Sequence, residues 1–241
     1  MASSSSCPAC DMMWRQVYPE WAKKEGIDYG ITARHYSEII AEQIAAGAFR
    51  FPANAIPQTT VTWHDSCHIG RASGVYDPPR DLIKAIPNVT FVEMAHNREC
   101  AHCCGSVLTL IKEPDVAAVV GKSRLDEAGE VGAAKGFALC PPCRFQFRVG
   151  AEATQSPVEV VDLAHFAATA LGFELPDPHP EVRAQWAVFE AMIKLMTPEG
   201  FAQLMGTMWP ELVAAMPLGM GRMMRAMGRV PGALDAMRPV F

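Results

Sequence analysis

The chain contains the segment Thr59-Thr60-Val61-Thr62-Trp63-His64-Asp65-Ser66-Cys67, which is rich in β-branched residues. These residues alternate along the segment and predict a strand over residues 59–66 that ends just before Cys67. Similar short apolar runs predict three further strands over residues 88–94, 136–139 and 158–161. Predicted helices over residues 79–85, 115–129 and 163–171 separate the strands, so we expect an α/β fold with a small parallel sheet.

Five of the eight cysteines follow the pattern C-x35-C-C-G-x34-C-x-x-C, which comprises Cys67, Cys103, Cys104, Cys140 and Cys143. Cysteines this far apart in sequence converge only if the fold brings three loops together. Ligands of parallel α/β sheets bind outside the carboxyl ends of the strands, and Cys67 and Cys140 each follow a predicted strand. The pattern therefore predicts one site built from five thiols, with Gly105 allowing a close approach of the backbone.

Five thiolates are more than one tetrahedral zinc ion needs. Soft ligands in this number suit an iron–sulfur cluster. Zinc remains the alternative, because Cys100-x-x-Cys103 and Cys140-x-x-Cys143 could form a four-thiolate site. In that case the chain would be a zinc-binding, non-catalytic scaffold that docks redox partners.

On these residues the chain resembles the CCG cysteine-rich domain family, which includes the B and D subunits of heterodisulfide reductase. Members usually carry two motifs. The second is complete here over residues 61–149, whereas Ser6-Cys7-Pro8-Ala9-Cys10 matches only the end of the first. The resemblance implies a [4Fe-4S] cluster, non-cubane in the heterodisulfide reductases, held by all five cysteines. We therefore expect the C-terminal part of a longer protein, a split subunit or a degenerated single-site relative.

The resemblance also implies a function. We expect an iron–sulfur electron-transfer subunit of a heterodisulfide-reductase-like oxidoreductase, rather than a complete enzyme, with disulfide or quinone-pathway chemistry at the cluster. No G-x-G-x-x-G fingerprint is present, so flavin chemistry would belong to another chain. The expected partners are other redox subunits: a flavoprotein, a ferredoxin-like protein, or a membrane cytochrome or quinone subunit.

Three further cysteines have open roles. Cys7 and Cys10 could be metal ligands completed by a partner or a missing segment, a relic, or a redox dithiol whose thiol pKa is lowered at a helix N-terminus. Cys100 could be a sixth thiol that exchanges with substrate or cluster sulfide, or a loop residue without a role.

Four histidines and two arginines flank the motif cysteines, namely His64, His68, His96, His102, Arg71 and Arg98. The histidines could donate hydrogen bonds to cluster sulfur or carry protons, or they could be solvated loop residues. The arginines could offset the negative charge of a thiolate cluster, or they could be ordinary surface charges.

Composition limits the class of protein. The chain has 241 residues, of which 50% are hydrophobic, enough for one large or two small domains. A net charge of −5 argues against nucleic-acid binding. The sequence contains no run of about 18 apolar residues, so no membrane-spanning helix is expected. Eight cysteines without a secretory signal indicate a reducing, cytoplasmic location.

We predict three parts. Residues 1–50, with helices over 12–24 and 33–46, would be the remnant of a first cysteine-rich domain, and residues 51–178 the complete one. Residues 179–241 would form a helical tail that holds ten of the 14 methionines. Its methionines and arginines favour docking to a partner or to the inner face of an anionic membrane.

Overall fold

The computed structural model describes residues 2–53, 56–110, 114–185, 187 and 206. The chain divides into two units, Met1–Asp177 and Pro178–Phe241. Within the second unit, residues 179–185 are helical. The remainder of the predicted methionine-rich tail lies almost entirely outside the described residues, and the three-part organisation stays a prediction.

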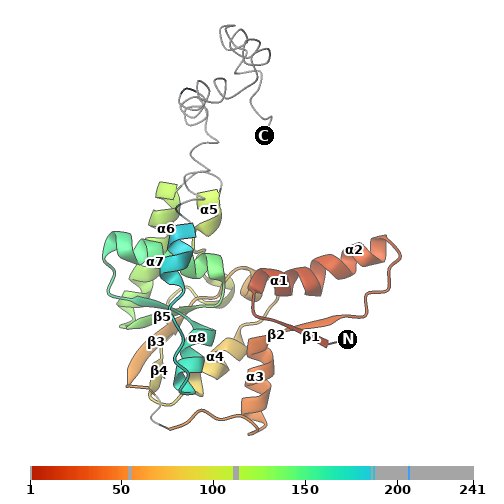
Figure 1. Cartoon of the computed structure of the whole chain (residues 1–241), viewed down its shortest axis with the longest axis horizontal. Helices are drawn as coiled ribbons and strands as arrows, with labels where there is room; N and C mark the ends of the chain where they lie inside the picture. Colours follow the sequence, from red (N-terminus) through yellow and green to blue (C-terminus); the bar gives the residue numbers. More distant parts are fainter. Residues whose placement is uncertain (1, 54–55, 111–113, 186, 188–205, 207–241) are drawn as a thin grey trace, which may run out of the picture. The chain divides into compact units, whose positions relative to one another are not determined.

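A four-stranded parallel sheet forms the centre of the first unit (Figure 1), and its strands are β3 (Thr59–Trp63), β4 (Val89–Phe91), β5 (Lys135–Ala138) and β6 (Glu159–Asp162). The strand order is β4-β3-β5-β6. Val61 of β3 pairs with Phe91 on one side and with Lys135 on the other. This arrangement confirms the predicted α/β fold with a parallel sheet, although β3 ends three residues earlier than predicted.

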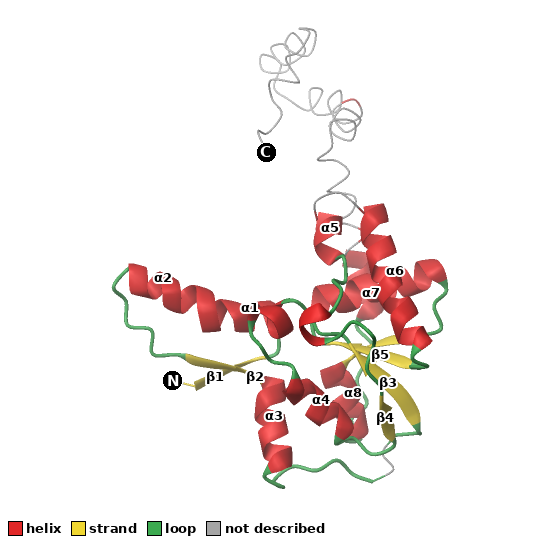
Figure 2. Ribbon diagram, turned by 180° about the vertical axis from the view of Figure 1, so that it is seen from behind, coloured by secondary structure: helices red, strands yellow, loops and turns green. Residues whose placement is uncertain are grey.

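The helices of this domain are α4 (Asp77–Lys84), α5 (Ser106–Leu110), α6 (Pro114–Glu130), α7 (Pro141–Thr154) and α8 (Leu163–Ala170). Figure 2 shows α4 and α8 on one side of the sheet and α6 and α7 on the other. Val61 and Trp63 pack with the α4 and α8 side chains, whereas Ala138 packs with the α6 and α7 side chains. The sheet is therefore covered on both faces, as parallel sheets usually are.

The larger core cluster lies on the α4 and α8 side. Trp63, Leu82, Ile83 and Leu163 are fully inaccessible to solvent there. Burial of each such side chain contributes about 1.5–3 kcal/mol. This core holds β3 rigidly at the point where the chain continues toward Cys67.

The N-terminal segment has its own two-stranded parallel sheet, β1 (Ala2–Ser5) with β2 (Thr32–His35). Between them runs a helical stretch made of α1 (Pro8–Met12), the π-helical η1 (Met13–Val17) and α2 (Tyr18–Lys24). The predicted helix over 12–24 therefore begins earlier, at Pro8, which is a favourable first helical residue.

The helix predicted over residues 33–46 is α3 (Tyr36–Ala45) and starts later than expected. Its first three predicted residues are part of β2, because they pair with the serine run of β1. His35 then caps α3: its Nδ1 accepts a hydrogen bond from the Ser37 backbone N–H, and the Glu38 side chain accepts one from the His35 N–H. This capping box fixes the switch from strand to helix.

Four of the described helical segments were not predicted, namely α5, α7, the π-helical η2 (His68–Ala72) and the 3₁₀ turn η3 (Arg98–Cys100). Helix α7 begins with Pro141 and Pro142 directly after Cys140, which is a normal helix start. Among the described residues, every helix is too short or too polar to cross a lipid bilayer.

Candidate metal centre

Three of the five motif cysteines follow the two central strands β3 and β5, and the other two lie on the connection from the edge strand β4 to α5. Cys67 follows β3 and precedes η2, and the pair Cys103-Cys104 leads into α5. Cys140 follows β5 and is the N-cap of α7, whose first turn holds Cys143. The sequence prediction that these loops converge at one sheet edge agrees with the topology.

The five thiols form one group, in which hydrogen bonds link four and Cys67 lies within electrostatic range of them. Cys104 accepts hydrogen bonds from the thiols of Cys103 and Cys143, and Cys143 also bonds to Cys140. Cys67 interacts electrostatically with Cys104 and Cys140. The structure thus brings together all five cysteines of the pattern, and their role as metal ligands is taken up below as a proposal.

These contacts separate the thiols into two kinds. Hydrogen bonds from Cys103 and Cys143 lower the pKa of Cys104 to about 2 despite its burial. A hydrogen bond from Cys143 likewise lowers the pKa of Cys140. The pKa values of the donors Cys103 and Cys143 are raised by the same bonds, and burial raises that of Cys67. Two thiolates are therefore stabilised by their thiol neighbours, and thiolate is the form that binds metal.

The site has a closed side and an open side. Cys104, Cys140 and Cys143 are buried, whereas Cys67 is partly exposed and Cys103 is exposed. A group bound by the five sulfurs would be shielded by the sheet and would approach the surface beside Cys103.

Two of the four flanking histidines contact the thiol group. A ligand nitrogen of His64 and the sulfurs of Cys104 and Cys143 lie within 4.8 Å of one another, and Nδ1 of His68 lies 3.9 Å from the Cys67 sulfur. The His64 ring is buried against the Phe147 ring, and its Nε2 has no hydrogen-bond partner among the described residues.

The charge state of His64 follows from its surroundings. Burial and the nearby Arg124 lower its pKa to about 4, so the ring is neutral at neutral pH. A neutral imidazole can serve as a nitrogen ligand or as a hydrogen-bond donor, but not as a standing positive charge beside the thiolates.

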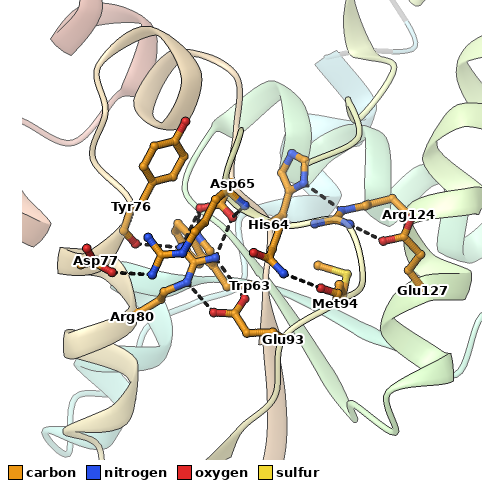
Figure 3. A network of polar contacts seen from close by, with 12 residues as sticks. Trp63, His64, Asp65, Tyr76, Asp77, Arg80, Glu93, Met94, Arg124 and Glu127 are labelled. Carbon is orange, nitrogen blue, oxygen red and sulfur yellow. Dashed lines mark hydrogen bonds and ion pairs between the residues drawn. The ribbon is translucent and has the colours of Figure 1, made fainter. Parts of the chain in front are cut away.

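A buried ion-pair network supports the loop that carries Cys67 (Figure 3). Arg80 binds both carboxylate oxygens of Asp65 at 2.7–2.8 Å and also the carboxylate of Glu93 at 2.6–3.0 Å. The Trp63 indole N–H donates to Asp65 at 2.9 Å. Burial opposes the charge of Asp65, but its bonds to Arg80 hold the carboxyl pKa below its usual value. A paired buried carboxylate of this kind fixes the direction of the chain two residues before Cys67.

Two further contacts tie the Cys67 loop to the Cys103 loop. The Arg98 backbone N–H donates to Asp65 at 2.7 Å, and the Arg71 guanidinium donates to the Ala101 carbonyl at 2.6 Å. The Arg98 side chain pairs with Asp77. Of the two flanking arginines, Arg71 also acts electrostatically on the Cys67 thiol, whereas Arg98 shapes the loop through its backbone.

Gly105 is required by two features of the fold that the sequence did not predict. It has φ +84°, and a Cβ at this position would lie 2.8 Å from the Ala117 carbonyl of α6. Glycine is thus needed for the left-handed conformation and for the close approach of α6.

The remaining cysteines lie apart from this group. Cys100 is exposed at the end of η3 and makes no contact with a motif thiol in the described part of the chain. Cys7 and Cys10 contact each other, and the hydrogen bond that Cys10 donates to Cys7 is the main reason that the Cys10 pKa is raised. The role of this pair as metal ligands, a relic or a redox dithiol stays a prediction. Helix α1, which carries Cys10, packs against η2 just after Cys67.

The charged residues that organise the site were not predicted from the sequence, namely Asp65, Arg80, Glu93, Arg124 and Glu127. Of these five, only Asp65 could have been recognised from the local sequence, because it follows the buried strand β3 closely. The others are brought to the site by helices and loops far along the chain.

The fold and the thiol group define a cysteine-rich α/β domain whose five sulfurs meet at one edge of a parallel sheet. Residues 61–148 match the cysteine-rich domain family CCG. This confirms the resemblance inferred from the cysteine spacing.

Several curated proteins are similar to the chain. It is 33% identical over 167 residues to the D subunit of the dihydromethanophenazine:CoB–CoM heterodisulfide reductase of Methanosarcina barkeri, covering 68% of this chain and 40% of that protein. It is 34% identical over 159 residues to the probable iron-sulfur-binding oxidoreductase FadF of Bacillus subtilis, covering 64% of this chain and 22% of FadF. An EtfAB:quinone oxidoreductase of Syntrophomonas wolfei is 39% identical over 100 residues, covering 42% of this chain and 13% of that protein. The chain thus spans about two fifths of the length of the heterodisulfide reductase protein.

Proposed function

We propose that the chain is an iron–sulfur electron-transfer subunit of a heterodisulfide-reductase-like oxidoreductase. The observation that carries the proposal is the single group of five thiols, three of which follow β3 and β5. The similar proteins support it, because their names describe a heterodisulfide reductase component and an iron-sulfur-binding oxidoreductase.

The residues present fit an iron–sulfur cluster. Cys67, Cys103, Cys104, Cys140 and Cys143 would hold it, and an iron–sulfur group supplies one-electron transfer at a potential set by its surroundings. The chain itself supplies two stabilised thiolates, a mostly buried location and the neutral His64 beside two of the sulfurs. Burial on the sheet side would exclude water, and the exposed Cys103 would give a redox partner access.

We further propose that the cluster is a [4Fe-4S] cluster of non-cubane type. The support is the donor count, since the site offers five sulfur ligands where an ordinary [4Fe-4S] cluster uses four. In this proposal the partners are other redox subunits, such as a flavoprotein or a quinone-reactive membrane protein, and the cluster acts on a disulfide or in a quinone pathway.

Replacement of Cys104 and of Cys100 by Ser tests the ligand set. After anaerobic reconstitution, Cys104→Ser should lose or convert the cluster, because this thiol accepts bonds from two others at the centre of the group. Cys100→Ser should retain wild-type iron and acid-labile sulfide, because Cys100 lies outside the group. Equal iron loss in both variants would show that the ligand set is wrong.

A zinc-binding scaffold is the second candidate, and one observation favours it. His64, Cys104 and Cys143 form a buried donor set of a type that zinc accepts. The four-cysteine set predicted for zinc from the sequence includes Cys100, which lies outside the group. Colourless protein with stoichiometric zinc after anaerobic reconstitution with iron and sulfide would establish the scaffold and overturn the iron–sulfur proposal.

A further inference from the structure

A second group of metal-ligating side chains lies outside the five-thiol group. Three residues compose it: His96 and His102 on the loop between β4 and α5, and Glu127 on α6. Their ligand atoms all lie within 4.8 Å of one another. Nδ1 of His96 and Nδ1 of His102 lie 2.8 and 2.9 Å from the same oxygen, Oε1 of Glu127.

The two imidazole rings lie face to face. They stack with their centroids 3.8 Å apart and their planes 24° from parallel. The loop that carries them is shaped between Met94 and Ala101: the Asn97 side chain donates to the Met94 carbonyl, and the Arg71 guanidinium holds the Ala101 carbonyl. Both rings remain about half exposed, so an ion can enter from solvent.

The carboxylate is held in place from behind. Glu127 is 12% exposed, and its second oxygen, Oε2, accepts a hydrogen bond from the buried Arg124. Burial raises the Glu127 pKa, but Arg124 and His96 outweigh this effect and the pKa is lowered. The group therefore offers an ionised carboxylate whose other oxygen, Oε1, accepts a hydrogen bond from Nδ1 of His96 and lies 2.9 Å from Nδ1 of His102. A carboxylate oriented by a second hydrogen bond is the usual support of a metal ligand.

The spacing fits a small divalent ion. Zinc binds imidazole nitrogen and carboxylate oxygen at about 2.0–2.2 Å, so two ligands of a tetrahedral ion lie about 3.3 Å apart. The observed 2.8 and 2.9 Å separations need to open by only about half an ångström. Three protein ligands would leave the fourth position to water.

We propose that His96, His102 and Glu127 form a divalent transition-metal site of the zinc class, distinct from the five-thiol group. A bound ion would clamp the loop of residues 96–102 onto α6 and so steady Cys103, the next residue along the chain. The proposal does not depend on what the five thiols bind, because its donors are nitrogen and oxygen alone.

Zinc titration of the reduced, metal-stripped full chain tests the proposal, with bound zinc counted by elemental analysis and its ligands identified by X-ray absorption. The wild type should bind one equivalent that has only nitrogen and oxygen neighbours, in addition to any sulfur-ligated zinc. The double variant His96→Asn with His102→Asn should lose that equivalent and keep the sulfur-ligated zinc. Two matched controls, Glu130→Gln on the same helix and His165→Asn, should bind as the wild type does.

Two results would overturn the proposal. The first is a double variant that binds as many equivalents as the wild type. The second is a wild-type spectrum in which all bound zinc has sulfur neighbours, which decides the matter even where the variant fails to fold. Retention of the sulfur-ligated zinc in Cys104→Ser, together with the nitrogen and oxygen equivalent, would leave this site standing and count only against the ligand set proposed above.

Discussion

Replacement of Arg80 by Met should destabilise the chain by about 3–5 kcal/mol, which is the usual cost of removing one partner of a buried ion pair. Both side chains of the Arg80–Asp65 pair are only 1% exposed. Without the guanidinium, the Asp65 carboxylate would keep the Trp63 indole and the Arg98 backbone N–H as donors but would face no positive charge from Arg80. The variant leaves a buried charge that its surroundings no longer balance.

Glu93→Gln is the matched control for this prediction. Glu93 contacts the same guanidinium but is 37% exposed, so its loss should change the stability by about 0–1 kcal/mol. The free energies of unfolding can be measured by denaturant titration of the reduced, metal-free full chain, followed by tryptophan fluorescence. If both variants shift the free energy of unfolding equally, by less than about 1 kcal/mol, the Asp65–Arg80 pair does not support the Cys67 loop as argued.

Three further substitutions have defined outcomes. Gly132→Ala should lower the free energy of unfolding by about 1–2 kcal/mol, because Gly132 has φ +69° and open space around it. Gly105→Ala should lower it more, because its Cβ would meet a carbonyl at 2.8 Å. Equal unfolding midpoints of the two variants would contradict this prediction. Burial lowers the pKa of His35, so wild-type stability should be complete above the unfolded histidine pKa of about 6.5 and fall as the pH drops toward the folded value. His35→Asn, which keeps a capping side chain, should remove up to about 1.4 kcal/mol per pH unit of this slope, and the pH dependence is measured by denaturant titration at several pH values; identical pH profiles of wild type and His35→Asn would refute the assignment.

The strands of the central sheet could be predicted because each is a short β-branched or apolar run bounded by turn residues. Strand β2 could not, since Thr32–His35 precedes a helical pattern directly and is extended only because it pairs with Ala2–Ser5. Helix α7 was not predicted because its start, Pro141-Pro142, falls inside the Cys140-x-x-Cys143 pair, where two prolines also suit a turn. The π-helical η2 has no pattern of its own, because its geometry depends on the contacts made by the chain around Cys67.

The cysteine spacing predicted which thiols meet, because loops at the ends of neighbouring parallel strands must lie close together. It could not predict the buried charges. Arg80 and Arg124 belong to helices whose sequences resemble ordinary solvated faces, and their burial follows from partners 15 and 60 residues away, Asp65 and His64. Glu127 and the two stacked histidines show the same limit, since pairing between distant residues is a property of the folded chain.

The parallel pairing of β3 with β5 also sets the order of events during synthesis. Cys67 leaves the ribosome 76 residues before Cys143. At about 5–20 residues per second, the first thiol waits about 4 to 15 seconds for the last. During that interval β3 lacks its neighbour β5, and the nascent chain carries separate, reactive cysteines rather than a site. Any metal that the five thiols hold is therefore acquired after α7 has been made, and the cell must keep the earlier cysteines reduced until then.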